Sequence, residues 1–247
     1  MNVYKMIRKI FLKERASSED YIRFLKSHGV LIGEDVVIFR PFNTVIDAQN
    51  PHLLSIGDHV MMTGPVTILT HDYSWSVLKK KYGVILGNQR KTVIGNNVFI
   101  GWGAMVLGGS VIGDNVIVGA GSVVSGVLES DSVYAGNPAK KIMSLEEFLN
   151  KRQKRQLDEA CTYVLEYKKR YGNYPTEDKL DEYFYLFSDG YNLNPHFKKK
   201  MLLLMNEEFC YSMIRSMERQ FSDYAEFLEY VKQRAEVENK VEWVGNH

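Results

Sequence analysis

The sequence predicts a mainly β protein, in which a solenoid of short parallel strands lies between an N-terminal helical segment and a C-terminal α-helical domain. The first observation is an aliphatic residue at every sixth position: Ile94, Ile100, Val106, Ile112, Val118 and Val124. The second is a small or moderate side chain four places after each of them: Val98, Ala104, Ser110, Val116, Ser122 and Leu128. No helix has a period of six, and a short repeat of fixed length predicts units that stack on their neighbours.

The repeating unit also has a fixed place for turn-forming residues. Glycine follows the aliphatic residue at positions 95, 101, 113 and 119, and asparagine stands two places further on at Asn97 and Asn115. Glycine and asparagine adopt backbone conformations that β-branched residues resist. The unit, aliphatic-Gly-x-x-small-x, closely resembles that of the hexapeptide-repeat acyltransferases. The resemblance implies a left-handed parallel β-helix with triangular coils.

The solenoid is expected over residues 30–143. Its register begins at Ile32, continues through Ile38, skips at positions 44 and 50, and returns at Ile56. Between Ile68 and Ile94 the spacing is not a multiple of six, which predicts a loop over residues 71–91 that leaves the coil. Insertions of this kind tend to lie on the binding face of a repeat protein.

Helical patterns flank the solenoid on both sides. Residues 1–29 contain an apolar stripe that Ser17 or Ser18 begins and Gly29 ends. Residues 144–247 begin with a capping box, Ser144 and Glu147. Breaks at 172–175, 188–190 and 194–195 predict a bundle of four or five helices, with Thr176 and Asn194 as N-caps. The aromatic stripes of this domain are expected to form its core and oligomer contacts, with binding of the acceptor as an alternative.

The composition excludes several classes of protein. Lys and Arg total 31 against 30 Asp and Glu, so no global charge indicates nucleic acid. Two cysteines suit a reducing compartment. No apolar run is long enough to span a bilayer, and the N-terminal residues lack the apolar core and cleavage site of a signal peptide. Together these features predict a cytoplasmic protein. The basic, amphipathic segment 3–13 is expected to pack on the end of the solenoid, with proximity to a membrane surface as an alternative.

Two motifs indicate chemistry. GPVTILTHDYSW ends a coil just before the loop, and SVYAGNPAKKI closes the solenoid. Both resemble the acetyl-CoA-dependent O-acetyltransferases that act on galactosides, maltose and capsular polysaccharides. The resemblance implies that His71 is the general base, because a sugar hydroxyl is a weak acid and imidazole accepts a proton near neutral pH. No motif for a covalent nucleophile is present, which favours direct transfer.

A second polar residue is expected to orient His71 or the acceptor. The family often supplies an asparagine from an earlier coil, and the corresponding stretch here is RPFNTVID. Pro41 falls near the expected position, so Asn43 and Asp47 both remain candidates.

The cofactor and the assembly are implied by the same resemblance. Acetyl-CoA, the co-substrate, is expected in a groove between subunits of a homotrimer, with no metal ion. The matching residues are Trp102, Ala120, Ser125, Gly126, Pro138, Lys140 and Lys141.

The acceptor is expected to contact the loop. Tyr73, Trp75 and Tyr82 offer flat apolar faces for a sugar ring, and Asp72 is adjacent to the predicted base. Phe99 stands where the family usually has tryptophan, which suggests a reshaped acceptor pocket.

These features predict transfer of an acetyl group to a hydroxyl of a saccharide, a surface polysaccharide or its precursor. One alternative is acetylation of an antibiotic or an amino sugar on the same fold. A zinc carbonic anhydrase would need three convergent histidines, and residues 30–143 contain only His52, His59 and His71. A non-catalytic scaffold is the remaining alternative.

Overall fold

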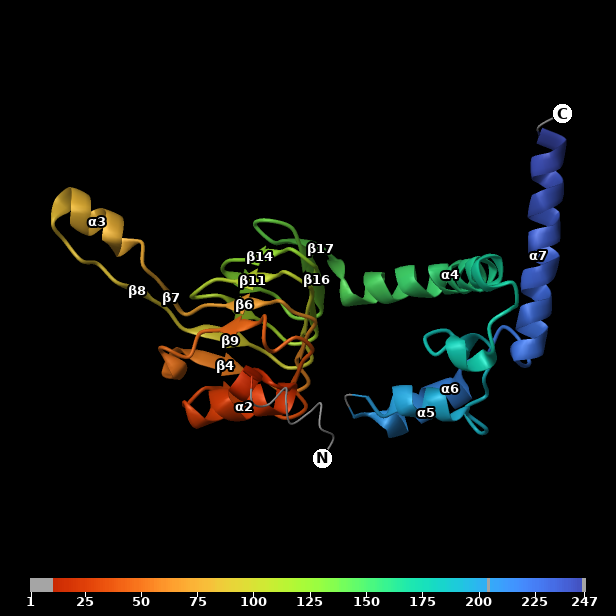
Figure 1. The fold of residues 1–247 in the computed structure, drawn as a ribbon, viewed down its shortest axis with the longest axis horizontal. Coiled ribbons are helices and arrows are strands. Elements are labelled where there is room, and N and C mark those ends of the chain that lie inside the picture. Colours follow the sequence, from red (N-terminus) through yellow and green to blue (C-terminus); the bar gives the residue numbers. More distant parts are fainter. Residues whose placement is uncertain (1–10, 204, 246–247) are drawn as a thin grey trace. The chain divides into compact units, whose positions relative to one another are not determined.

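The computed structural model describes residues 11–203 and 205–245 of the chain. The predicted role of segment 3–13 therefore falls almost wholly outside the described residues. The chain divides into two compact units, residues 1–149 and 150–247 (Figure 1). This division does not test the three-part arrangement expected from the sequence, which stays a prediction.

The first unit is a parallel β-helix with three sheets. Sheet A contains β1 (Leu31–Ile32), β4 (Leu54–Ile56), β9 (Thr92–Ile94), β12 (Val111–Ile112) and β15 (Val127–Leu128). Sheet B contains β2 (Val37–Ile38), β5 (Met61–Met62), β10 (Phe99–Ile100), β13 (Val116–Val118), β16 (Ser132–Ala135) and the antiparallel β17 (Lys140–Ser144). Sheet C contains β3 (Val45–Ile46), β6 (Thr67–Ile68), β11 (Met105–Val106) and β14 (Val123–Val124). The predicted fold class is confirmed.

The core of the β-helix consists of the repeated residues. All six aliphatic residues from Ile94 to Val124 are at most 2% exposed, as are the six smaller residues that follow them. Ile100 pairs with Met62 on one side and Val118 on the other, so each coil stacks its inward residue on the next. The skipped positions have a local cause. Ile46, eight residues after Ile38, occupies the inward position of its sheet and pairs with Ile68.

Helix α2 (Ser18–Ser27) covers the open end of the first coil. Its N-cap is Ser17, whose side chain accepts a hydrogen bond from the backbone N–H of Asp20. The Ser18 hydroxyl accepts from the N–H of Ile38 at 2.9 Å, and the buried Tyr21 hydroxyl accepts from the N–H of Ile46 at 3.2 Å. The helix therefore supplies partners to edge groups that no further coil can satisfy.

Replacing Tyr21 by Phe tests this cap. The buried N–H of Ile46 would lose its partner, so we expect the free energy of unfolding of the first unit to fall by about 1–3 kcal/mol. Urea unfolding, with hydrogen exchange at the Ile46 amide, measures the loss. The control is Tyr171→Phe, which removes an exposed hydroxyl from the end of the helix over residues 145–171. Equal stability of the two variants would contradict the capping role.

The segment predicted to be a loop is an arm with regular structure. β7 (His71–Asp72) and β8 (Asn88–Gln89) form an antiparallel pair, and α3 (Trp75–Tyr82) lies between them (Figure 1). Gly83 ends α3 in the left-handed conformation with φ +73°. The helix buries no side chain completely, which explains why the sequence shows no strong periodicity there.

The second unit is helical. α4 (Leu145–Tyr171) is followed by α5 (Pro195–Met201), α6 (Glu207–Ser216) and α7 (Tyr224–Gly245), with short 3-10 turns at Glu177–Lys179 and Phe184–Leu186. The first unit also has 3-10 turns, at Lys13–Arg15 and Pro51–Leu53. The capping box is confirmed, because Ser144 and Glu147 exchange hydrogen bonds of 3.1 and 2.7 Å. Asn194 caps α5 as predicted. Thr176 is at the predicted N-cap position of its 3-10 turn, but its hydroxyl donates to the Asp178 side chain and accepts no backbone N–H.

The core of the second unit combines aliphatic side chains with a group of packed aromatic rings. Phe184 stacks on Phe197 with ring centroids 4.7 Å apart, and Phe227 is fully buried beside Phe187. No helix in the described ranges is both long and apolar enough to cross a membrane.

Candidate functional site

One corner of the β-helix contains the predicted base and its partner. The C/A corner is the edge where each coil passes from sheet C to sheet A. Asp47 follows β3 at this edge, and His71 follows β6 one coil later. Because both strands belong to sheet C, stacking of the coils brings the two side chains together although they are 24 residues apart in the sequence.

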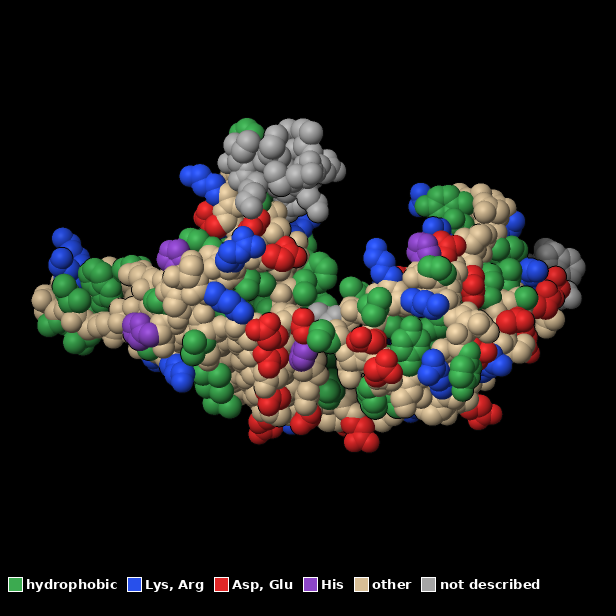
Figure 2. Space-filling model, turned by 90° about the horizontal axis from the view of Figure 1, so that it is seen from below, with side chains coloured by type: hydrophobic (Ala, Val, Ile, Leu, Met, Phe, Trp, Pro, Cys, Tyr) green, Lys and Arg blue, Asp and Glu red, His purple; other side chains and the backbone are tan. Residues whose placement is uncertain are grey.

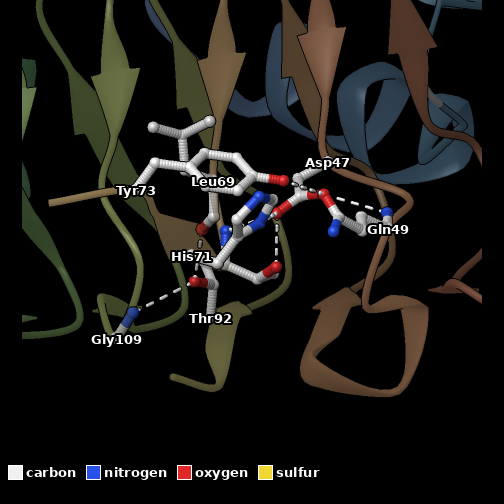
Figure 3. A network of polar contacts seen from close by, with 8 residues as sticks. Asp47, Gln49, Leu69, His71, Tyr73, Thr92 and Gly109 are labelled. Atoms are coloured by element: carbon white, nitrogen blue, oxygen red, sulfur yellow. Dashed lines mark hydrogen bonds and ion pairs between the residues drawn. The ribbon is translucent and has the colours of Figure 1, made fainter. Parts of the chain in front are cut away.

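The Asp47 carboxylate is the centre of a hydrogen-bond network (Figure 3). Its Oδ2 lies 2.6 Å from His71 Nδ1 and accepts from the Thr70 backbone N–H at 3.0 Å and from the Thr70 hydroxyl. Its Oδ1 accepts from the backbone N–H of Gln49 at 3.0 Å. The side chains are 6% exposed for Asp47 and 13% for His71. Each carboxylate oxygen is therefore fixed by donors of the protein itself.

The environment keeps Asp47 ionised. Burial acts to raise the pKa of Asp47, but hydrogen bonds from Thr70, Gln49 and His71 outweigh it and hold the pKa below the ordinary value. A carboxylate can only accept a hydrogen bond, so the proton shared with His71 resides on Nδ1. In the neutral imidazole Nε2 then carries the lone pair, and no protein group within the described ranges bonds to it. This arrangement can accept a proton from a bound molecule.

The backbone beneath His71 is fixed by the next coil (Figure 3). The buried Thr92 hydroxyl donates to the Leu69 carbonyl at 2.7 Å and accepts from the Gly109 N–H at 3.2 Å. Gly108 packs so closely that a Cβ there would lie 2.9 Å from the Thr70 carbonyl carbon. A larger residue at position 108 would displace the strand that carries the base.

One aromatic ring contacts the imidazole, and a second ring lies next to the first. Tyr73 meets His71 edge to face with ring centroids 5.2 Å apart, and its hydroxyl donates to Gln49 Oε1 at 3.2 Å. Trp75 lies 6.0 Å beyond Tyr73. Tyr82, also predicted to contact the acceptor, lies at the far end of α3 and is 63% exposed.

Asp72 does not belong to the network around Asp47. Its Oδ1 accepts from the Ser74 N–H at 2.9 Å, and its Oδ2 accepts from the Asn88 side chain. Hydrogen bonds from Ser74 and Asn88 lower the pKa of Asp72. Asp72 thus closes the base of the arm, and its direct contact with an acceptor stays a prediction.

Comparison with known proteins identifies the family. The family model described as bacterial transferase hexapeptide (six repeats) matches residues 91–126. Protein CapG of Staphylococcus aureus is 44% identical over 147 residues, which are 59% of this chain and 83% of CapG. The chain belongs to the hexapeptide-repeat transferase family.

Solved structures of this family are also similar to the chain. A hexapeptide-repeat acetyltransferase of Vibrio cholerae is 19% identical, with a TM-score of 0.41 over 58% of this chain and 89% of that chain. A maltose O-acetyltransferase of Clostridium difficile 630 is 25% identical, with a TM-score of 0.40 over 57% of this chain and 83% of that chain.

Other predicted hexapeptide-family site residues lie at a second corner. The B/C corner is the edge between sheets B and C. It contains Asn43 on the first coil and, two coils later, Trp102, Ala120 and Pro138 on successive coils. Trp102 is 48% exposed, with the Arg40 guanidinium 4.8 Å from its ring centroid. Among the described hydrogen bonds, none joins Asn43 to His71, whereas Asp47 bonds to it directly.

The remaining predicted residues lie at the C/A corner and on strands of sheet B. Ser125 and Gly126 are exposed at the C/A corner, on the edge that carries His71. Lys141 donates to Glu129 at 3.0 Å, a bond that raises the pKa of Lys141, while the exposed Lys140 has no ion pair in the described part of the chain. Phe99 is half-buried on β10, away from the C/A corner.

Three polar residues of the network were not predicted. Thr70 and Gln49 fix the Asp47 carboxylate, and Thr92 fixes the strand beneath His71. Thr70 and Thr92 are fully buried at positions where the solenoid places small residues, so the sequence pattern alone predicts only packing for them.

Proposed function

We propose that the protein is an acetyl-CoA-dependent O-acetyltransferase that acts on a saccharide hydroxyl, with His71 as the general base. The observation that carries the proposal is the bond between His71 Nδ1 and the ionised Asp47, at 2.6 Å. It leaves Nε2 as a proton acceptor beside an exposed aromatic surface. Direct transfer needs a group of this kind and no covalent nucleophile.

In the proposed reaction, one proton passes from the acceptor hydroxyl to His71 and from His71 to the leaving sulfur. His71 Nε2 accepts the proton of the acceptor hydroxyl while the hydroxyl oxygen bonds to the thioester carbonyl carbon. The carbon–sulfur bond then breaks, and the imidazolium returns the proton to the leaving sulfur, giving an acetyl ester and a free thiol. Asp47 holds the imidazole in one orientation and stabilises its charged form.

Residues at both corners suit the co-substrate. Trp102 and Ala120 present exposed surface on neighbouring coils, and Lys140 is a cation available for a phosphate group. His71 lies at a different edge of the same β-helix. A site that uses both edges requires two copies of the chain, which supports a homotrimer with sites between subunits.

The proposal of a saccharide acceptor rests on the motif resemblance, on the Tyr73 ring beside the base and on the Trp75 ring next to Tyr73. A surface polysaccharide or its precursor remains the proposed substrate. We further propose a cytoplasmic location, because a chain with only two cysteines cannot form a disulfide framework and suits a reducing compartment.

Calorimetric titration with acetyl-CoA, and separately with CoA, tests the proposal before any acceptor is known. We expect micromolar binding, as is usual for enzyme substrates. The double variant Lys140→Ala/Lys141→Ala should bind both ligands more weakly while keeping the turnover at saturation. Absence of binding by the folded protein would contradict the proposed function. Unchanged affinity of the double variant would place the phosphates elsewhere.

A further inference from the structure

Arg90 ends the arm at the corner that carries His71. Its backbone N–H donates to the Thr70 carbonyl at 2.8 Å, so the returning chain lies against the residue that precedes the base. Its side chain runs over Gly109, where a Cβ would lie 3.0 Å from Arg90 Nε and 3.1 Å from Arg90 Cδ. Gly109 has φ +91°, so this position both favours glycine and leaves room for the arginine.

The Arg90 guanidinium forms no direct bond with a neighbouring carboxylate. No ion pair or side-chain hydrogen bond of Arg90 is found within residues 11–203 and 205–245. Asp72 is close enough to be affected by the charge, but Ser74 and Asn88 engage both of its oxygens. Asp47 is likewise engaged by its own donors. An exposed arginine side chain with no bonded partner in the described ranges therefore lies at the corner that carries His71.

The arm adds to this positive charge. Between Asp72 and Asp114 the chain has no acidic residue and five basic ones: Lys79, Lys80, Lys81, Arg90 and Lys91. All five are exposed, although the whole chain has a net charge of only +1. On the face seen in Figure 2, the tip of the arm has basic and hydrophobic side chains and no acidic ones. Charge concentrated in this way attracts an anion to the site.

We propose that the acceptor is an anionic saccharide and that Arg90 binds its oxyanion, a carboxylate or a phosphate, next to the hydroxyl that receives the acetyl group. The inference rests on the proposed function, since it names the class of saccharide. The planar fork of a guanidinium matches both oxyanions with two parallel hydrogen bonds. Tyr73 lies beside His71, Trp75 lies next to Tyr73, and both rings would face the apolar side of the same sugar.

Paired acceptors test the proposal and separate the two oxyanions. One pair is an oligosaccharide of uronic acids and its carboxyl-reduced neutral form; the other is a sugar phosphate and the free sugar. We expect kcat/KM of the wild type to be about 10- to 100-fold higher for the anionic member of one pair, as for hydrogen bonds to charged groups. Arg90→Gln should remove that preference through KM, and Arg90→Lys should restore part of it. Neither variant should change the affinity for acetyl-CoA.

Three results would overturn the inference. They are a wild type that does not prefer anionic acceptors, an Arg90→Gln variant that slows both members of a pair equally, and a variant that binds acetyl-CoA more weakly. The last would assign Arg90 to the cofactor phosphates. Absence of acetyl-CoA binding by the wild type would instead refute the proposed function, so the two failures are distinguishable.

A matched pair of variants tests the contribution of the arm. Lys79→Gln/Lys80→Gln removes two charges from α3, and Lys198→Gln/Lys199→Gln removes two exposed charges from α5 of the second unit. For the anionic acceptor, kcat/KM should fall as the salt concentration rises, and this fall should be smaller in the α3 variant only. Equal salt dependence in both variants would contradict steering by the arm.

Discussion

Replacing His71 by Ala is expected to lower the turnover by about 10²–10⁴-fold, the usual contribution of general-base catalysis. Acetyl-CoA affinity should persist, since the co-substrate is expected to bind groups other than the imidazole. The fold should persist too, because His71 contributes no side chain to the buried apolar core. Single-turnover measurements with a hydroxyl acceptor, together with calorimetry, separate the chemical step from binding.

The matched control is His52→Ala, which removes an exposed imidazole from a turn of the same unit. It should have the turnover of the wild type. A His71→Ala variant as active as the wild type on its hydroxyl acceptor would refute the assignment. Activity that survives only with an amine acceptor would favour the amino-sugar or antibiotic alternative, because an amine depends less on a base.

The core of the β-helix could be predicted from the sequence because the side chain at every sixth position points into the coil. Every repeated residue from Ile94 to Val124 is buried, as the pattern predicts. The pattern fails where the coil length changes. Ile38 and Ile46 are eight positions apart because the corner between them is longer, so a strict count of six passes over Ile46 although it occupies an inward position.

The same irregular corner explains why the partner of His71 could not be chosen from the sequence. Asn43 and Asp47 are four residues apart. Which of them lies at the same corner as His71 depends on the length of the corner between Ile38 and Ile46, and the six-residue pattern does not give that length. In the structure Asn43 lies at the B/C corner and Asp47 at the C/A corner, where His71 also lies. Only the spatial stacking of β3 on β6 separates the two candidates.

The arm and the buried threonines show a second limit. β7 and β8 have two residues each, too few for an alternating pattern, and α3 has little buried surface. Their pairing depends on contacts between residues 71–72 and 88–89, which no local pattern encodes. For Thr92 the sequence pattern predicts only packing in the core. Its bonds to Leu69 and Gly109, which fix the strand beneath His71, are known only from the structure.

Replacing Asp47 by Asn is expected to lower the turnover by about 10²–10⁴-fold, since the corresponding change in hydrolytic triads costs about 10⁴-fold through the wrong imidazole tautomer. The carboxylate accepts from donors on both oxygens, and an amide has only one acceptor oxygen. If the amide oxygen faces His71, the NH₂ group opposes the Gln49 N–H. If the NH₂ group faces His71, Nδ1 must accept and the proton moves to Nε2, where it blocks the base.

The ¹⁵N chemical shifts of the imidazole distinguish this effect from a loss of fold. The wild type should show the Nδ1-protonated tautomer and Asp47→Asn a shift toward the Nε2-protonated one, with acetyl-CoA affinity retained. Asp114→Asn is the matched control, because Asp114 Oδ1 accepts a backbone N–H in the same way that Asn96 does one coil earlier. That control should keep the turnover of the wild type. An Asp47→Asn variant with an unchanged tautomer and unchanged turnover would show that Asp47 serves only to fix Thr70 and Gln49, and that His71 needs no oriented carboxylate to act.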